Sequence, residues 1–235
     1  MRFKGMRRIA VIPARGGSKR LPSKNIVDFL GRPIIAYSIE AARECNLFNR
    51  VVVSTDDEYI ARVSEQFGAE TDRRPGELAT DDAHLLDVCL DLFDREAEQG
   101  RVYDQFCMVH ATSPLRQAGD IKAVVELLEK GRCLFACALS EFNHHAHQAL
   151  KLVENGFIEP MWPELVNRHS HLMPHLVGGN GSTYAAFIDA FREQRTFFGT
   201  PMRGHLMDRM RSIDIDVEED LEVMKLFKEY LDAKE

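Results

Sequence analysis

The sequence has little of what marks a secreted, membrane-spanning or nucleic-acid-binding protein. Its five cysteines are an odd number and lie mostly in apolar surroundings, which is typical of reduced core thiols. The opening MRFKGMRR has no apolar signal core, and no stretch is apolar over the roughly 20 residues of a membrane span. Acidic residues outnumber basic ones by 37 to 30, which argues against nucleic acid as the main partner. We therefore expect a cytoplasmic protein with neither a membrane nor a nucleic acid among its partners.

Short apolar runs alternate with helical patterns over the first 140 residues. We expect strands at 8–12, 50–55, 104–110 and 133–139, and helices at 33–45, 57–68, 83–99 and 119–130, the last ending at Gly131. Strands separated by helices predict an α/β fold with a mostly parallel sheet. Such sheets bind ligands at the carboxyl ends of their strands, so the loop after the first strand lies where a ligand should bind.

The alternation stops between residues 141 and 179, where His, Asn, Pro and Gly are frequent and no helical period is found. We interpret residues 141–179 as an inserted module of short strands and loops that serves dimerisation. Its HHAH run lacks a further ligand at metal spacing, so polar or interface residues are favoured there over a metal site. The core would then consist of residues 1–140 and 180–235, with a last helix at 217–231.

The first loop, ARGGSKRLPSKN (residues 14–25), concentrates cations in an otherwise acidic chain. It matches neither GxxxxGK[ST] nor GxGxxG, yet its residue types suit a polyphosphate. The glycines allow backbone N–H groups to approach an anion, the serine adds a donor, and the arginine fork and the lysines supply charge. The residues concerned are Arg15, Gly16, Gly17, Ser18, Lys19 and Lys24. A solvated basic loop is the alternative, and the position after the first strand favours phosphate binding.

Two carboxylates occur close together near the other end, in SIDID (residues 212–216). In an extended chain Asp214 and Asp216 point to the same side. They repel unless a cation lies between them, and Mg²⁺ takes a few carboxylates together with substrate phosphate oxygens. The alternative is that they are caps or turn residues before the last helix. For Asp56 and Asp57 we expect such a capping role at the helix 57–68.

Six motifs occur in the order found in the N-acylneuraminate cytidylyltransferases, the CMP-sialic acid synthetases. They are IPARGGSKRLPSKN, STDD, RPGELATD, ATSPLR, NGSTY and SIDIDVEEDL, and they extend over nearly the whole chain. The sequence thus resembles this family, which includes pseudaminic and legionaminic acid branches. The resemblance implies a Rossmann-like, three-layer nucleotidyltransferase core of the glycosyltransferase-A-like type, a homodimer, CTP as the donor and Mg²⁺ as the cofactor. The implied reaction joins a nine-carbon keto sugar acid to CMP and releases pyrophosphate.

The resemblance also implies a role for particular residues. The implied nucleotide-binding residues are Arg15, Gly16, Gly17, Ser18, Lys19, Lys24, Asn25 and Arg74. The implied sugar-binding residues are His110, Thr112, Lys151 and Arg168. Lys151 and Arg168 would reach the sugar carboxylate from the inserted module, across the subunit interface. Asp214 and Asp216 would bind the metal and would form the catalytic set together with Arg15 and Lys24.

Three departures from the family pattern leave the identity of the sugar acid undecided. His110 and Ala111 stand where sialic acid enzymes usually have glutamine and proline, and glycines occupy 178 and 179 where many have an arginine. MWPE (residues 161–164), followed by NRHS, is more similar to the pseudaminic acid branch, whereas SIDID and NGSTY are more similar to the sialic acid branch. The alternatives are a pseudaminic or eight-carbon sugar acid cytidylyltransferase, a guanylyltransferase of the same fold, or an inactive nucleotide-binding regulator. Either an aspartate or a metal-bound hydroxide would accept the proton of the sugar hydroxyl, and the sequence does not decide between them.

Overall fold

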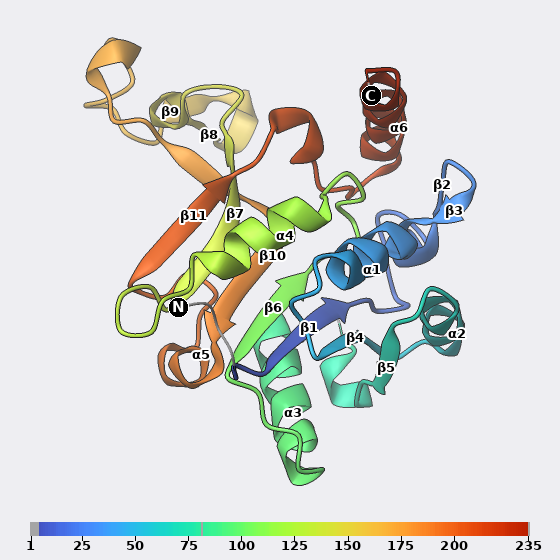
Figure 1. Ribbon diagram of the computed structural model, residues 1–235. Coiled ribbons are helices and arrows are strands. Elements are labelled where there is room, and N and C mark those ends of the chain that lie inside the picture. Colours follow the sequence, from blue (N-terminus) through green and yellow to red (C-terminus); the bar gives the residue numbers. More distant parts are fainter. Residues whose placement is uncertain (1–4, 81, 235) are drawn as a thin grey trace.

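The computed structural model describes residues 5–80 and 82–234, except for the side chain of Ser170. Asp81 of the RPGELATD motif and residues 1–4 and 235 of the expected core lie outside the described residues. A seven-stranded sheet in the order β11-β7-β10-β6-β1-β4-β5 forms the centre of the fold (Figure 1). Its strands are β1 (Arg8–Pro13), β4 (Arg50–Thr55), β5 (Glu70–Arg73), β6 (Gln105–Val109), β7 (Phe135–Glu141), β10 (Val177–Phe187) and β11 (Met202–Leu206). The helices are α1 (Ile34–Glu44), α2 (Glu58–Gln66), α3 (Leu85–Glu98), α4 (Ala118–Glu126), α5 (Ile188–Gln194) and α6 (Glu218–Asp232).

The sheet is mostly parallel, as the alternating pattern predicts. The pairs β1–β4, β1–β6, β4–β5 and β7–β11 are parallel, whereas β10 is antiparallel to both of its neighbours, β6 and β7. No α-helix separates β7 from β10, so the chain returns beside β7 in the opposite direction. The α/β fold with a mostly parallel sheet that the sequence predicts is confirmed.

Helices flank the sheet and bury its central strands. Ile9 to Ile12 of β1 have no exposed surface, because a parallel strand in the middle of such a sheet is covered on both faces. Helices α1 and α4 lie side by side (Figure 1). Helices α3 and α5 meet at a cluster of aromatic rings, where Phe106 of β6 lies 5.0 Å from Phe93 and 4.7 Å from Phe191 between ring centroids. The core is thus built on β1 and β6, whose carboxyl ends are adjacent.

Two expectations from composition can be compared with this fold. All five cysteines are buried and unpaired, which confirms them as core thiols. Over the described ranges, no helix combines the length and the apolar character that crossing a bilayer would require.

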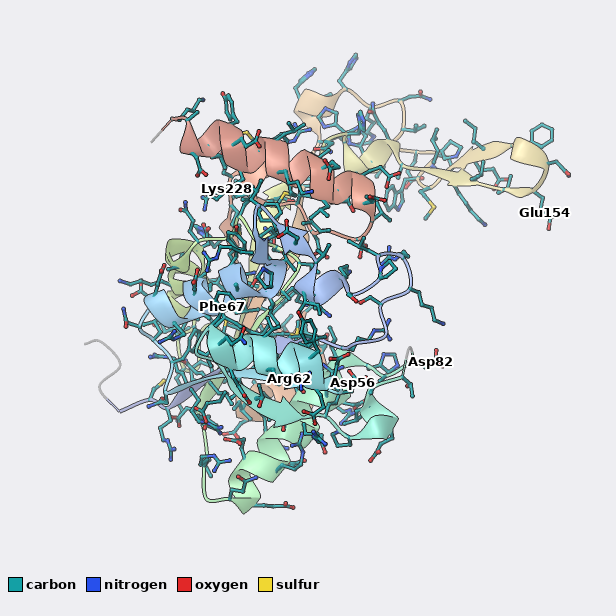
Figure 2. The ribbon with its side chains drawn as sticks, turned by 90° about the vertical axis from the view of Figure 1, so that its right-hand side faces the viewer. Asp56, Arg62, Phe67, Asp82, Glu154 and Lys228 are labelled. Atoms are coloured by element: carbon teal, nitrogen blue, oxygen red, sulfur yellow. The ribbon has the colours of Figure 1, made fainter. Side chains whose placement is uncertain are left out.

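The segment between β7 and β10 contains an arm that projects from the body of the molecule. Strands β8 (Leu150–Leu152) and β9 (Ile158–Pro160) form an antiparallel hairpin, and Glu154 lies near its tip (Figure 2). Apolar side chains on this segment are widely exposed, including Leu152 at 75% and Phe157 at 71%. The expected short strands and loops are therefore present. The role of the segment in dimerisation stays a prediction.

The structure differs from the sequence-based expectation in three respects. Helix α4 ends at Glu126 rather than beside Gly131, because Glu129 and Cys133 exchange two backbone hydrogen bonds and draw the chain out of the helix. Residues 212–216 have no regular secondary structure and are not a strand. Strands β5 and β11 were not expected, since both are edge strands with mostly exposed or half-exposed residues.

A buried carboxylate links three elements at the end of α3 and gives a first prediction. Glu96, which is 5% exposed, accepts hydrogen bonds from Arg101 at 2.6 and 2.7 Å and from Tyr103 at 3.0 Å, and it also pairs with Arg50. Arg101, Arg50 and Tyr103 together outweigh the effect of burial and hold the pKa of Glu96 at about 2, below its ordinary 4.5. Glu96→Gln is expected to cost about 3 kcal/mol of the free energy of unfolding at pH 7.

The lowered pKa of Glu96 determines how the destabilisation by Glu96→Gln depends on pH. A carboxyl with a lowered folded-state pKa stabilises the protein fully above pH 4.5, and this contribution disappears as the pH falls toward 2. Urea unfolding at pH 7 and pH 3 should therefore show a smaller difference between wild type and Glu96→Gln at pH 3. Glu98→Gln, at an exposed position of the same helix, is the control. An equal cost at both pH values would contradict the assignment.

Candidate active site

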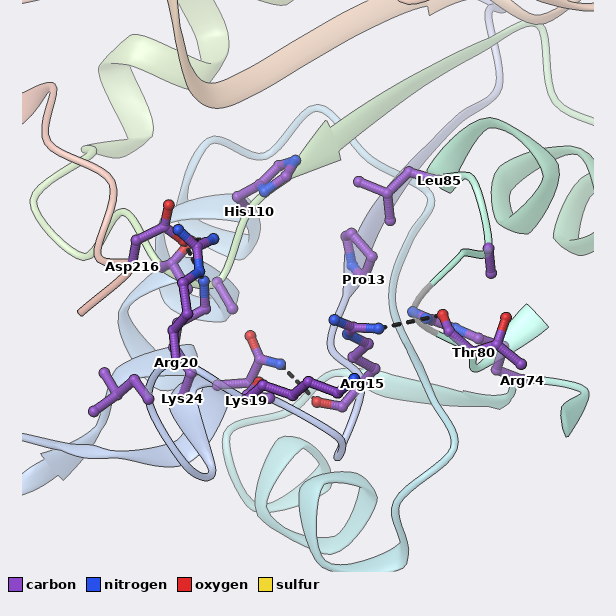
Figure 3. Close-up of a pocket in the computed structure, with 16 residues that line it drawn as sticks. Pro13, Arg15, Lys19, Arg20, Lys24, Arg74, Thr80, Leu85, His110 and Asp216 are labelled. Atoms are coloured by element: carbon purple, nitrogen blue, oxygen red, sulfur yellow. Dashed lines mark hydrogen bonds and ion pairs between the residues drawn. The ribbon is translucent and has the colours of Figure 1, made fainter. Parts of the chain in front are cut away.

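A cavity of about 500 Å³ opens at the carboxyl ends of the central strands. Pro13 ends β1, Arg74 follows β5 and His110 follows β6, so the cavity lies where a doubly wound sheet binds its ligands (Figure 3). Its lining residues are Pro13, Arg15, Ser18, Lys19, Arg20, Leu21, Lys24, Asn25, Arg74, Thr80, Ala83, Leu85, His110, Ala111, Thr112 and Asp216. The structure therefore brings together the first loop, Arg74, the ATSPLR motif and the second carboxylate of SIDID.

The backbone of the first loop is held from both sides. The Gly16 N–H donates to Asp56 Oδ1 at 2.9 Å, and the Asn25 amide donates to the Arg15 carbonyl at 2.9 Å. Gly16 and Gly17 do not line the cavity, whereas the side chains of their neighbours do. In this structure the Gly16 N–H already donates to a carboxylate, and its approach to a bound anion stays a prediction. The loop presents side chains rather than glycine amides to the cavity.

The two glycines of this loop should respond differently to substitution. A Cβ on Gly16 would lie 2.8 Å from Asp57 Oδ2, whereas one on Gly17 would meet nothing within 4 Å. Asp57 is the N-cap of α2 and accepts from the backbone N–H groups of Tyr59 and Ile60. Gly16→Ala is therefore expected to disturb this cap and to lower the free energy of unfolding by about 1 kcal/mol. Thermal and urea unfolding should show this loss, with Gly17→Ala close to wild type, and equal losses would contradict the account.

The cations of the cavity form two groups on opposite sides (Figure 3). On one side Arg15 donates to the carbonyl of Thr80 at 3.2 Å, and Arg74 donates to the carbonyl of Ser54 at 2.8 Å. On the other side the Lys24 ammonium and the Arg20 guanidinium each lie 2.8 Å from the same oxygen, Oδ1 of Asp216. A bound anion could therefore contact cations at both ends of the cavity.

The two carboxylates of SIDID have different surroundings. Burial would raise the pKa of Asp216, but the hydrogen bond and charge of Lys24, with the charge of Arg20, hold it below its ordinary value. Asp214 lies deeper, accepts a hydrogen bond from the Thr112 hydroxyl and does not line the cavity itself. Burial raises the pKa of Asp214, and the Thr112 hydrogen bond opposes this rise.

A neighbouring carboxylate, Asp220, takes the capping role that was the alternative for SIDID. Its Oδ2 accepts from the backbone N–H groups of Asp216 and Val217 at 2.8 and 3.0 Å, at the start of α6. The Asp216 side chain is directed to the cations of the first loop instead. The simple capping interpretation of Asp216 is therefore wrong.

The donor set fits a divalent cation that needs substrate to complete its coordination. Among the described residues, no three His, Cys, Asp or Glu side chains gather closely enough to hold a metal. Mg²⁺ in phosphoryl-transfer sites is commonly bound by one or two carboxylates, with phosphate oxygens and waters as the other ligands. Asp214 and Asp216 are separated by one residue and close enough for their charges to interact, so they could form such a pair once substrate is bound.

His110 and Thr112 form the wall of the cavity between the two groups of cations. Burial, with the charges of Arg116 and Lys24, lowers the pKa of His110 to about 4, although the charge of Asp216 opposes this shift. The imidazole is therefore neutral at physiological pH and is available as a hydrogen-bond donor or acceptor rather than as a cation. His110 borders the same cavity as the first loop, and its contact with a sugar stays a prediction.

Lys151 and Arg168 lie away from this cavity within the chain. Lys151 is an exposed residue of β8, on the projecting hairpin, and Arg168 is an exposed residue before the short helical turn at Ser170–Leu172. Neither lines the cavity. Their predicted contact with a sugar is thus not made in a single chain.

Two residues of the site, Arg20 and Thr80, were not assigned a role from the sequence, and a third, Asp56, has another role than the capping expected for it. Arg20 was counted among the cations of the loop but not among the binding residues, and it pairs with Asp216. The Thr80 carbonyl anchors Arg15, and Asp56 binds the loop backbone instead of capping α2. The partners of all three residues are far away in sequence, so their contacts could not be predicted. The one available signal was the basic character of the loop, which could have indicated Arg20.

Comparisons with known proteins place this geometry in context. Residues 9–153 match the sequence profile of the family described as Cytidylyltransferase. A pseudaminic acid cytidylyltransferase of Campylobacter jejuni is 33% identical over 222 residues, covering 94% of this chain and 96% of that protein. An N-acylneuraminate cytidylyltransferase of Escherichia coli is 32% identical over 225 residues, covering 92% of this chain and 50% of that protein. A CMP-N,N'-diacetyllegionaminic acid synthase of Legionella pneumophila is 30% identical over 227 residues, covering 90% of this chain and 91% of that protein.

A solved structure shows the same fold. The CMP:2-keto-3-deoxy-manno-octonic acid synthetase complexed with CTP superposes with a TM-score of 0.72 at 18% identity, covering 96% of this chain and 99% of that one. At this level of identity the likeness concerns the architecture of the sheet and its helices.

Proposed function

Because this chain belongs to the cytidylyltransferase family, we propose that it activates a nine-carbon keto sugar acid with CTP, releasing pyrophosphate and the CMP-sugar. The charge of the cavity is the observation that supports this proposal most directly. In a chain with a net charge of −7, the described lining residues include five cations and one carboxylate. The cations are Arg15, Lys19, Arg20, Lys24 and Arg74. Such a set is complementary to a nucleoside triphosphate and favours its capture by long-range attraction.

The reaction is a displacement at the α-phosphorus of CTP. The anomeric hydroxyl oxygen of the sugar acid forms a bond to the α-phosphorus, the bond from that phosphorus to the bridging oxygen of pyrophosphate breaks, and the hydroxyl proton passes to a base or to solvent. Charge spreads over phosphate oxygens in the transition state, so positioned cations accelerate the step. Arg15 and Lys24, on opposite sides of the cavity, are proposed to bind the triphosphate and to stabilise this charge.

Asp214 and Asp216 are proposed to hold Mg²⁺ together with phosphate oxygens of CTP. The ion would offset phosphate charge and orient the leaving group. In the structure Lys24 and Arg20 neutralise Asp216, so both cations are in place to turn from this carboxylate to the triphosphate. Thr112 keeps Asp214 beside the cavity wall by its hydrogen bond.

The sugar acid is proposed to bind beside His110 and Thr112, and a second copy of the chain is proposed to complete its site. The hairpin projects from the body and exposes apolar side chains such as Leu152 and Phe157, which favours burial in a homodimer. Lys151 lies on the same hairpin and Arg168 on the same inserted segment. Two cations brought across an interface would suit the carboxylate of a keto sugar acid.

Pyrophosphate release is the test of this function. The protein is incubated with CTP and Mg²⁺, and sialic, legionaminic, pseudaminic and eight-carbon keto sugar acids are added one at a time. Turnover with one nine-carbon acid is the expected result, with a stoichiometric CMP-sugar as the product. Turnover with the eight-carbon acid alone would correct the sugar class, and GTP in place of CTP tests the guanylyltransferase alternative. CTP binding without turnover on any acid would contradict the proposal and favour a regulator.

A further inference from the structure

Arg116 ends the ATSPLR motif, and no role has been assigned to it above. Its side chain is 2% exposed, and within residues 5–80 and 82–234 no carboxylate forms an ion pair with it. Burial lowers the pKa of Arg116 to about 10, so the guanidinium is still charged at neutral pH. A buried cation is costly unless its hydrogen bonds compensate for lost hydration, so the contacts of this group indicate what it maintains.

The guanidinium fork joins three elements behind the cavity wall. Its Nη1 donates to the carbonyl oxygens of His110 and Ser182, both at 3.1 Å, and its Nη2 donates to Ser38 Oγ at 2.7 Å. Ser38 belongs to α1 and in turn donates its hydroxyl to the His110 carbonyl at 2.9 Å. Ser182 lies on β10, so one planar group connects α1, β10 and the turn that leaves β6.

The turn that Arg116 holds also positions the deeper carboxylate. This turn, residues 110–112, forms part of the cavity wall. The carbonyl of Thr112 accepts from the backbone N–H of Ile215 at 3.0 Å, and its hydroxyl donates to Asp214. A shift of the turn would therefore move Asp214 and the segment around it. Since residues 212–216 have no regular secondary structure, such contacts hold them in place.

We propose that Arg116 is a positioning residue for cytidylyl transfer: its fork clamps turn 110–112 between α1 and β10 and so fixes the Thr112–Asp214 pair. The inference rests on the proposed function and adds a residue to that same site. Lysine cannot replace the fork, because a single ammonium lacks the fixed planar set of donors that reaches Ser38 on one side and two carbonyls on the other.

Arg116→Lys tests the clamp because it keeps the charge and removes the fork. Arg8→Lys is the matched control, since Arg8 is also a buried arginine (5% exposed) whose Nε donates to Gln105 Oε1 at 2.6 Å, at the amino end of β1. Misplacement of a reacting group by about 1 Å costs on the order of 100-fold in rate. We expect Arg116→Lys to lower kcat by about 30- to 100-fold with less than about a threefold change in the Kd of CTP. Arg8→Lys should lower Tm without changing kcat.

Ser38→Ala provides a second test if Arg116→Lys does not fold. It removes the hydroxyl shared by Arg116 and the His110 carbonyl, and we expect a fall in kcat of about 3- to 10-fold at unchanged Kd for CTP. The methyl NMR signal of Thr112 reports the turn directly, and it should shift in both variants but not in Arg8→Lys. Wild-type kcat and an unshifted Thr112 signal in Ser38→Ala and Arg116→Lys would overturn the proposal.

The two proposals fail in different ways. If wild-type protein releases no pyrophosphate with any sugar acid, the proposed reaction fails, while the Thr112 signal still tests whether Arg116 and Ser38 hold the turn. If wild type is active and the variants match it, only the clamp is wrong. A parallel loss of Tm and kcat in Arg8→Lys and Arg116→Lys, with Thr112 unshifted in both, would show a structural role and overturn the clamp.

Discussion

Replacement of Lys24 by methionine is expected to lower kcat by about 1,000-fold. The Lys24 side chain is 20% exposed, and its ammonium lies 2.8 Å from Asp216, at the junction of the first loop and the proposed metal pair. A cation held in a partly dry site stabilises developing phosphate charge more strongly than one in water, and loss of one such donor typically costs 100- to 1,000-fold. The variant also leaves Asp216 without one of its two partners. Pyrophosphate release at saturating CTP measures the effect.

Arg20→Met is the matched control for this variant. Arg20 contacts the same oxygen of Asp216 at the same distance of 2.8 Å, but its side chain is 66% exposed. Ion pairs of exposed side chains contribute little, so we expect a loss of tenfold or less. If Arg20→Met and Lys24→Met reduce kcat equally, burial does not distinguish the two cations and the role given to Lys24 is wrong.

Asp216→Asn is expected to lower kcat by a similar factor, about 1,000-fold, while the fold is preserved. The amide cannot replace a carboxylate as a Mg²⁺ ligand. Lys24 and Arg20 also lose the negative charge with which both form an ion pair. The cap of α6 should remain, because the Asp220 carboxylate accepts from the backbone N–H of residue 216, which the substitution does not alter. Activity over a magnesium series measures the loss, and electron paramagnetic resonance of Mn²⁺ with CTP measures metal binding without turnover.

Asp208→Asn removes a carboxylate from the same part of the chain and serves as the control. Asp208 is exposed and accepts from the backbone N–H of Met210 at 2.9 Å, at the start of a short 3₁₀ turn before SIDID. Its loss should leave both kcat and Mn²⁺ binding near wild type. Full activity in Asp216→Asn, or metal binding equal to wild type, would remove Asp216 from the metal site.

The sequence predicted those parts of the fold that are dominated by local pattern. The apolar runs of β1 and β4 mark them as buried strands, and the amphipathic period marks α3. Strand β5, with the sequence ETDR, lies at the edge of the sheet, where backbone pairing rather than an apolar run specifies the strand. A single sequence therefore contains little that would indicate an edge strand of this kind.

The same holds for the site: features that depend on neighbouring residues could be predicted from the sequence, whereas contacts between distant residues could not. The composition of the first loop predicted a cavity rich in cations, and the structure places Arg15, Lys19 and Lys24 along one. The pairing of Gly16 with Asp56 could not be predicted, because it joins residues 40 apart and depends on how β1 and β4 are aligned. The proposed contact of Lys151 with a second copy of the chain is not formed within the single folded chain, where Lys151 lies away from the cavity.

The Lys24–Asp216 pair joins residues 192 positions apart, so the cations and the carboxylates of the cavity come from opposite ends of the chain. During synthesis on a ribosome the first loop emerges early, and it has no acidic partner from this pair until the segment before α6 follows. The sheet imposes the same order, since β10 inserts between β6 and β7, which are both made before it. A nascent chain therefore lacks this ion pair until the segment before α6 has been translated. A chain cut at the tip of the β8–β9 hairpin would leave the five cations of the cavity on one fragment and Asp216 on the other, and the two fragments would have to associate to restore the cavity.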